Sequence, residues 1–537
     1  MKSLTRLQIL EKQNKDLRVR LENQKARSEL AFAGTEDEMN ALKSQLSGKD
    51  KTISMLQAGL ESLTKENENQ RQIIEALSGE NASLREALDR SEDRASKLEA
   101  MLKKDSTNSS KPPSTDPLFG ASKANSEKTK SGKKVGGQPG HKGHRLAPSL
   151  NPDIIVVKMP PDLCPCCGGD VVINESYEPR QIMDIEVIMT VTEERVHRGQ
   201  CAKCSLEISG EFSEGFNSPV GYGPNVKATV AMLNADANVP IHKTALFVSS
   251  LTEGLISMSD GTVVNITAEL ARQFAPTVHD IVIALASCGV LNVDETGVRV
   301  NGILTWMQII SNDSFSLYGR SLKRGTPNDT MENLIMLFTG VLVHDHLKSY
   351  YGYTHVSHAE CNVHVLRYLK AVTEIMKHPW AKEMAELLLN ANLRKKELME
   401  AGFSGIDEEE LEAIRSSYIS ILDQGTREYE SAIAGKRNIT YYDEERRLLN
   451  RLREYFDEHL RFLSDFSVPF SNNGAEHGAR HVKGKQKTSG GFRSDGGTDN
   501  YAAIASVIAT LRKQRMHIFP VIRNAFQGIC PSFADTG

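Results

Sequence analysis

A strand-like segment at residues 290–300 constrains the fold of this chain more than any other stretch. Its apolar positions alternate and are rich in β-branched side chains, and it runs into Asn301-Gly302, a dipeptide that favours a two-residue hairpin turn. The pattern after the turn predicts a second strand at 303–311 and a third at about 315–318. The chain is therefore expected to contain a sheet that begins with consecutive antiparallel strands.

Three acidic residues stand where such a sheet would bring them together. Because side chains alternate between the faces of a strand, Asp294 is expected on the more polar face and Glu295 on the apolar one. Asp345 ends a short apolar strand at 341–344, and Glu476 follows an Asn- and Gly-rich loop that opens a helix. Three carboxylates on one core can hold two divalent cations, the arrangement used for in-line displacement at phosphorus.

Length and composition exclude several classes of protein. The 537 residues predict roughly three or four domains. The net charge of -4 is ordinary, so any basic surface for nucleic acid must be local. No apolar run approaches the ~20 residues that span a bilayer, and the first residues continue into a charged helix rather than a signal sequence, so we expect a cytoplasmic protein.

Residues 1–104 lack proline and are rich in helix-forming residues. From Ile53 to Leu102 a heptad pattern places mostly apolar residues at both seam positions without interruption. Asn67 and Asn81 lie at one seam position, where they would pair across a parallel dimer and fix its register. The pattern predicts a parallel coiled coil that makes a homodimer or higher multimer, because a single solvated helix would expose the leucine side chains of the seam to water.

Residues 105–150, in which Lys and Arg outnumber the acids, are predicted to be a flexible basic linker. Lys133, Lys134 and Lys142 would track DNA phosphates. A solubilising tether explains this stretch equally well.

Two Cys-x-x-Cys knuckles lie in residues 151–220, with strands such as 186–192 expected between them. This spacing is typical of a tetrahedral structural zinc site, with Cys166 left over, and predicts a zinc-binding, DNA-binding domain. The expected ligands are Cys164, Cys167, Cys201 and Cys204.

Helical patterns alternate with the core segments in the rest of the chain. Helices at 227–237, 241–250 and 259–274, the last capped by Ser259 or Asp260, suit a helix-turn-helix-like region at 221–280, or a plain helical connector. The core would occupy 281–357 and 467–520, separated by a helical insertion at 358–466 and followed by a tail at 521–537. At the start of the insertion, Cys361 and His364 form half a metal site, but a packed or hydrogen-bonded pair is the favoured interpretation.

The helix that carries Glu476 also carries a basic face. Arg480, Lys483 and Lys487 follow the acid at helical spacing, and Arg493 follows a Gly-rich turn. Basic groups beside an acidic metal site suit a polyanionic substrate.

Seven motifs in this order resemble those of the bacterial IS66 insertion-sequence family of DDE transposases. They are NSSKPPS at 108–114, GGQPGHKG at 136–143, the cysteine knuckles, DET at 294–296, HD at 344–345, CxxHxxR at 361–367 and NNxAE at 472–476. The chain departs from the family pattern at His346, where Gly is frequent, and at His477, where Arg is frequent.

The resemblance implies a multidomain α+β protein with a ribonuclease-H-like α/β core. Asp294, Asp345 and Glu476 would hold two Mg²⁺ ions, or Mn²⁺ in their place, alongside the structural Zn²⁺. The expected reaction is DNA cleavage and strand transfer at transposon ends by a nucleoid-associated multimer, with companion proteins of the same element as further partners. The alternative is a zinc-containing DNA-binding regulator whose ribonuclease-H-like core is inactive.

Overall fold

A computed structural model describes residues 2–30, 36–104, 108, 146–173, 175–213, 215–436 and 439–533. It divides into two compact units, Met1–Lys103 with Ile433–Asp443, and Lys104–Ala432 with Glu444–Gly537. The linker residues Lys133, Lys134 and Lys142 lie outside the described residues.

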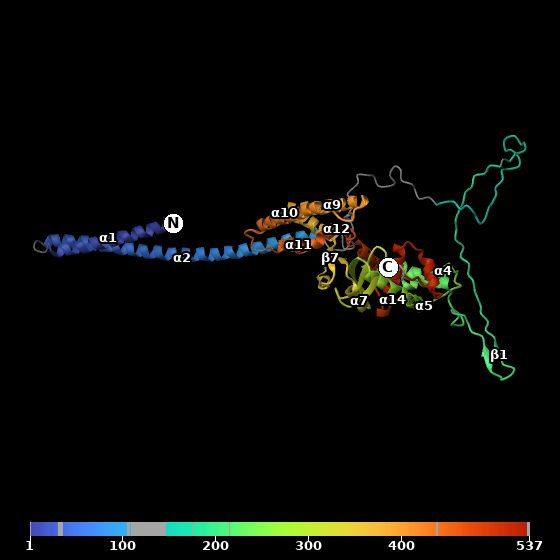
Figure 1. Cartoon of the computed structure of the whole chain (residues 1–537). Helices are drawn as coiled ribbons and strands as arrows, with labels where there is room; N and C mark the ends of the chain where they lie inside the picture. The colour runs from blue at the N-terminus through green and yellow to red at the C-terminus, as the bar shows by residue number, and fades with distance from the viewer. Residues whose placement is uncertain are drawn as a thin grey trace. The chain divides into compact units, whose positions relative to one another are not determined.

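The first unit is mainly two long helices. Helix α1 (Lys2–Leu30) packs beside the first part of α2 (Glu36–Leu102), and Leu21 is buried there (Figure 1). The predicted helical run is therefore two helices. Several heptad positions further along α2 are exposed, including Ile74, Leu84 and Leu88.

The cysteine-knuckle region carries little regular structure. Strands β1 (Arg198–Gln200) and β2 (Glu207–Ser209) pair antiparallel on either side of the second knuckle. The predicted strand at 186–192 is wrong: this segment is extended but forms no strand pairing among the described residues, and Val187 and Ile188 are exposed. Alternation alone does not make a strand where no neighbouring strand accepts its hydrogen bonds.

A helical region leads into the core of the second unit. Its elements are α3 (Pro224–Ala231), the π-helical turn η2 (Met232–Asp236), α4 (Ile241–Leu251), α5 (Asp260–Gln273) and α6 (Ala275–Ala286). The predicted cap is confirmed, because the Ser259 hydroxyl accepts a hydrogen bond of 3.1 Å from the Thr262 backbone N–H. Val230, Val248 and Ile266 build a small core among α3, α4 and α5.

A five-stranded mixed sheet with the order β5-β4-β3-β6-β7 forms the centre of the second unit. Its strands are β3 (Val290–Val300), β4 (Ile303–Ser311), β5 (Ser316–Ser321), β6 (Val341–His344) and β7 (Ser357–Glu360). The first three strands are antiparallel, and β6 and β7 continue parallel to β3. Asn301 and Gly302 have φ of 49° and 80°, the left-handed conformation that the predicted hairpin turn requires.

Strand β7 corrects the predicted start of the insertion at residue 358. Residues 357–360 belong to the sheet, and the insertion begins with α8 (Asn362–Ala371). This strand has no apolar sequence pattern. Its polar side chains His358 and Glu360 can be buried because each is paired with another side chain inside the protein. The insertion continues as η4 (Val372–Met376), α9 (Pro379–Glu400), α10 (Glu408–Ile433), η5 (Thr440–Tyr442), α11 (Asp443–Glu454) and α12 (Phe456–Ser464).

The remaining helices cover the sheet. Helix α13 (Asn473–Ser489) packs on β3 and β4, while α6 and α7 (Asp329–Leu337) contribute to the core on the opposite face. Helix α14 (Asp495–Lys513) contributes side chains to both cores. Helix α14 also borders the edge strand, since Ser506 Oγ and Thr510 Oγ1 accept hydrogen bonds from the N–H groups of Tyr318 (2.9 Å) and Ser316 (3.1 Å).

The C-terminal segment is not the tail predicted for 521–537. Helix α15 (Ile518–Ala525) buries Ile522, and Phe533 packs into the same core. Within the part of the chain that the structure describes, no helix has the length and apolar character needed to cross a membrane.

Candidate active site

Strand register places the first two predicted acids next to each other. Strands β3 and β6 are parallel, with Asn292 paired to Val343. Asp294 and Asp345 each follow these paired residues by two positions, so they lie next to each other on β3 and just beyond the end of β6.

Asn472 brings the third acid close to β3. Its side chain accepts a hydrogen bond of 3.0 Å from Asn292 Nδ2 and donates one of 2.7 Å to the carbonyl of Val293. Because Asn472 precedes α13, both bonds hold the start of that helix against β3. Glu476, in the first turn of α13, therefore faces the end of the strand that carries Asp294.

The three carboxylates influence one another electrically. Burial, followed by the nearby charge of Asp345 and a further contribution from Glu476, raises the pKa of Asp294 to about 8. The buried phenol of Tyr350 also lies within reach of this charge, because burial and then the carboxylates Glu295, Asp294 and Asp345 raise its pKa well above its usual value. A buried carboxylate with two further acids nearby fits a divalent cation, whose charge would offset their repulsion.

Glu476 is held between basic and soft groups. Its Oε2 lies 3.2 Å from Arg480 Nη2 and 4.0 Å from Arg367 Nη2. Its Oε1 faces Cys361 Sγ at 3.9 Å and His364 Nδ1 at 3.6 Å. The side chain is 14% exposed, so these groups are its immediate environment.

Glu295 faces away from this site. Its carboxylate accepts hydrogen bonds from Arg324 Nε (2.7 Å) and from the Gly325 N–H (2.8 Å), and its side chain is 3% exposed. It ties β3 to the segment after β5 and is spatially separate from the Asp294 face, as alternation along the strand predicts.

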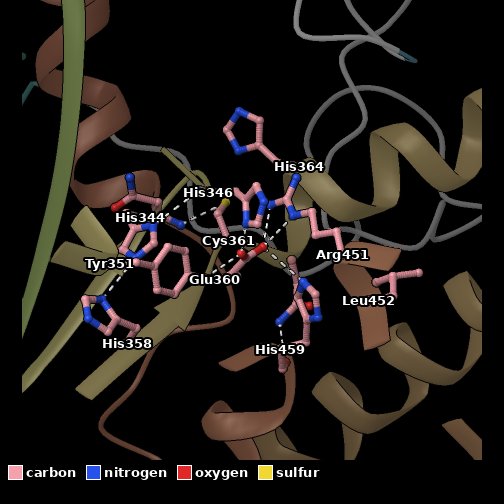
Figure 2. Close-up of polar contacts among 12 residues, drawn as sticks. His344, His346, Tyr351, His358, Glu360, Cys361, His364, Arg451, Leu452 and His459 are labelled. Atoms are coloured by element: carbon pink, nitrogen blue, oxygen red, sulfur yellow. Dashed lines mark hydrogen bonds and ion pairs between the residues drawn. The ribbon is translucent and has the colours of Figure 1, made fainter. Parts of the chain in front are cut away.

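A second buried carboxylate, Glu360, is fully enclosed by donors (Figure 2). His346, Tyr351 (2.6 Å), Arg451 (Nε at 2.8 Å) and His459 (3.0 Å) all contact it. Burial opposes ionisation, but the hydrogen bonds from the two histidines and the charge of Arg451 hold the pKa of Glu360 well below its usual range. We call these five residues the Glu360 network; the sequence contained no signal for it.

The Glu360 network holds the loop that follows Asp345. His346 adopts a φ of 73°, and its N–H donates to His344 Nδ1 at 3.2 Å. The other ring nitrogen of His344 lies 3.2 Å from His358, and burial lowers the pKa of His344 to about 3. Both neighbours of Asp345 are thus fixed by buried polar contacts, one on each side of the acid.

Comparison with known families decides the identity of the chain. Residues 220–500, just over half of its length, match the family model described as Transposase IS66 family. The chain belongs to the IS66 transposase family. A second model, described as Family of unknown function (DUF6444), matches residues 56–147. No curated protein matches the chain.

The family match spans all three acids of the transposase and the whole of its basic helix. On that helix Arg480 pairs with Glu476, while Lys483 donates to the Gly297 carbonyl beside β3. Lys487 and Arg493 are exposed. The sequence did not single out Lys485, which is buried and donates to the Asn234 carbonyl at 2.6 Å, joining α13 to η2.

The two cysteine knuckles of the transposase form separately. Hydrogen bonds from the backbone of Cys166 and Cys167 lower the pKa of Cys164, and those from Lys203 and Cys204 lower the pKa of Cys201. Each pair of thiols thus occupies a turn of the kind that presents thiolates to a metal. Among the described residues, however, the thiols of the two knuckles are not gathered into one cluster.

Proposed function

We propose that this transposase cuts and joins DNA at a site formed by Asp294, Asp345 and Glu476 in a ribonuclease-H-like core. The observation that carries the proposal is where the three acids lie: Asp294 and Asp345 each follow, by two positions, residues paired between β3 and β6. Asn472 fastens the start of the helix that carries Glu476 to β3. Burial, followed by the charges of Asp345 and Glu476, raises the pKa of Asp294 to about 8, as expected for such a cluster. The sheet supports it too, because three antiparallel strands are continued by two parallel ones. In this proposal, residues separated widely in sequence share one charged centre.

The chain's own groups would divide the work of a phosphodiester displacement. Two Mg²⁺ ions, or Mn²⁺, bound to the three acids would stabilise the charge on the entering and leaving oxygens. Besides burial, the charges of both Asp345 and Glu476 raise the pKa of Asp294. Asp294 is therefore the residue expected to bind both cations. No side chain needs to act as a nucleophile.

Arg480, Lys487 and Arg493 would hold DNA phosphates beside the acids. Arg480 is 67% exposed and pairs with Glu476, so its guanidinium can reach a substrate while remaining at the site. The Gly490-Gly491 turn, with φ of 73° and 117°, brings Phe492 back to pair with β3 next to Val300, and this sets Arg493 beside the β3–β4 hairpin. Lys483 is already engaged with the Gly297 carbonyl and would contribute mainly charge.

Outside the core, we propose three supporting roles. The knuckle cysteines Cys164, Cys167, Cys201 and Cys204 would bind one structural Zn²⁺ and stabilise a DNA-binding ribbon. The helices α3 to α5 would contribute a helix-turn-helix-like contact to transposon ends. Exposed apolar positions along α2 would pair two chains as a coiled coil, because a transposase that joins two ends needs at least two active sites.

The deciding experiment uses the full-length protein and a labelled duplex that carries a transposon end. Nicked and joined strands should appear with Mg²⁺ and be absent with Ca²⁺ or with chelator. Asp345→Asn should remove both products while leaving retention of the labelled duplex in a gel unchanged. Binding of the end without any cleavage by the wild-type chain would instead favour a DNA-binding regulator with an inactive core.

A further inference from the structure

The segment after β7 and the start of α13 bring three metal-binding side chains together. Cys361 precedes α8, His364 lies one turn further along the chain, and Glu476 comes from the first turn of α13. One ligand atom from each residue lies within 4.8 Å of the other two. The sequence presented only the first two as half a metal site, and the fold supplies the third member.

One atom of this cluster is buried and unpaired. His364 Nδ1 has no exposed surface and no hydrogen-bond partner within the described part of the chain, and it points toward Glu476 Oε1 at 3.6 Å. A buried nitrogen without a hydrogen bond is unfavourable, which indicates that another partner belongs there. Cys361 and His364 lie directly beside the Glu360 network in Figure 2, whose members already bind one another.

The spacing matches that of a small tetrahedral ion. A zinc ion with bonds of about 2.3 Å to sulfur and about 2.0 Å to nitrogen or oxygen sets its ligand atoms about 3.3–3.6 Å apart. The observed separations from Glu476 Oε1 are 3.9 Å to Cys361 Sγ and 3.6 Å to His364 Nδ1. All three ligand atoms lie within 4.8 Å of one another, so side-chain shifts of about 1 Å or less would bring them around one ion.

Burial and the Glu476 carboxylate raise the pKa of the Cys361 thiol to about 12, so a bound cation is needed to hold it as a thiolate ligand. The backbone N–H of Asn472 donates to Cys361 Sγ at 3.1 Å, a contact that stabilises negative charge on sulfur. Arg480 and Arg367 lie on the Oε2 side of Glu476, so Oε1 is left to face the sulfur and the imidazole. A sulfur, a nitrogen and one carboxylate oxygen favour Zn²⁺ strongly over Mg²⁺, which prefers oxygen alone.

We propose that Cys361, His364 and Glu476 form a second zinc site, distinct from the cysteine knuckles. On binding, the thiol of Cys361 releases its proton to solvent and the sulfur bonds to the ion. Because Glu476 is also a ligand of the proposed magnesium site, the two sites compete for one carboxylate. Zinc at this position would therefore inhibit the DNA cleavage of the proposed function, on which this second part of the inference rests.

Metal content tests the site without any DNA. The full-length protein is stripped with chelator, incubated with Zn²⁺, freed of unbound ion by gel filtration and assayed for zinc per chain. Cys361→Ser and His364→Gln should each retain one ion fewer than the wild-type chain, since loss of a ligand weakens binding by at least about 100-fold. The matched control is Cys288→Ser, because Cys288 is outside the proposed site and its Sγ donates to the nearby carbonyls of Leu285 and Val290.

Equal zinc content in the wild-type chain, in Cys361→Ser and in His364→Gln would overturn the site. Circular dichroism establishes that each variant is folded. If the buried Cys361→Ser variant does not fold, His364→Gln decides the question, because its side chain lies partly at the surface with 14% exposure.

Competition between the ions tests the shared carboxylate. Zinc at ten times its dissociation constant fills about nine-tenths of the sites, so it should lower Mg²⁺-dependent cleavage by the wild-type chain about tenfold. In His364→Gln the ratio of rates with and without zinc should stay near one. Equal inhibition of both proteins would contradict competition at Glu476. A chain that binds the extra zinc but never cleaves DNA would refute the proposed function while leaving the site intact.

Discussion

Two buried carboxylates, Asp294 on β3 and Glu360 on β7, belong to the same sheet with β6 between them, and their electrostatics are opposite. Around Glu360, the protein supplies its own cation and donors, and the pKa of that acid falls. Around Asp294, burial and two further acids raise the pKa to about 8. A buried acid whose charge is already balanced serves to hold structure, whereas crowded acids without such balance are suited to bind cations from outside.

The largest expected difference is in catalysis. Asp294→Asn should lower the rate of end cleavage by about a thousandfold or more, because several kcal/mol of charge stabilisation are lost with the cations. The matched control, Glu295→Gln, alters the neighbouring acid on the opposite face and should cost less than about tenfold. Rates are measured under single-turnover conditions with Mg²⁺, and comparable losses in the two variants would remove Asp294 from the site.

The Glu360 network should dominate stability instead. Glu360→Gln leaves the buried Arg451 without its counter-charge, and breaking such a pair costs about 3–5 kcal/mol. Glu269→Gln removes a partner of Lys227 in a pair that is 22% and 30% exposed, and it should cost no more than about 1 kcal/mol. Urea unfolding followed by circular dichroism measures both. A small effect for Glu360→Gln would mean that the network is no more structural than a surface pair.

The contributions of the two clusters to the free energy of unfolding should change in opposite directions with pH. Asp294 has a folded pKa of about 8, above its usual 3.8, so its contribution is complete below about pH 4 and is lost as the pH rises toward 8. With chelator present, the free energy of unfolding of Asp294→Asn should therefore rise relative to that of the wild-type chain by about 2 kcal/mol or more between pH 5 and pH 8. The folded pKa of Glu360 lies below its usual 4.5, so the advantage of wild type over Glu360→Gln is present above that pH and shrinks on acidification.

Urea midpoints of the three proteins across pH 4–8 test this pair of trends. Saturating Mg²⁺ should cancel the gain of Asp294→Asn, because the cations stabilise only the wild-type site. Curves that move in the same direction for both variants would contradict the comparison.

A smaller effect should come from the packing that positions Glu476. A Cβ added at Gly478 would lie 2.7 Å from the Tyr318 hydroxyl and 3.1 Å from Ile309 Cγ2, so Gly478→Ala should destabilise the fold by about 1–3 kcal/mol. Gly496→Ala, with no atom within 4 Å of the new Cβ, should change stability by less than about 1 kcal/mol. Thermal unfolding compares the two, and equal midpoints would show that α13 accommodates the methyl group.

Local patterns in the sequence predicted the elements that depend only on residues close together along the chain. The strands 290–300 and 303–311, the Asn301-Gly302 turn and the Ser259 cap all occur as expected. Each depends on alternation or on a side chain bonding to its own backbone neighbourhood, which a short stretch fully specifies. The strand expected at 186–192 failed because pairing depends on a partner that the stretch does not contain.

The amino-acid sequence by itself determined which acids are present, their order along the chain, and the strand and helix that carry Asp294 and Glu476. Only the tertiary structure decided that a polar segment, Ser357–Glu360, becomes a buried strand, and that Glu476 turns one oxygen toward Cys361 and His364. The physical reason is distance along the chain. Glu360 is stable in the interior because of Arg451 and His459, which lie 91 and 99 residues away. Pairing with residues so far away along the chain produces no periodic pattern in the sequence around the buried residue.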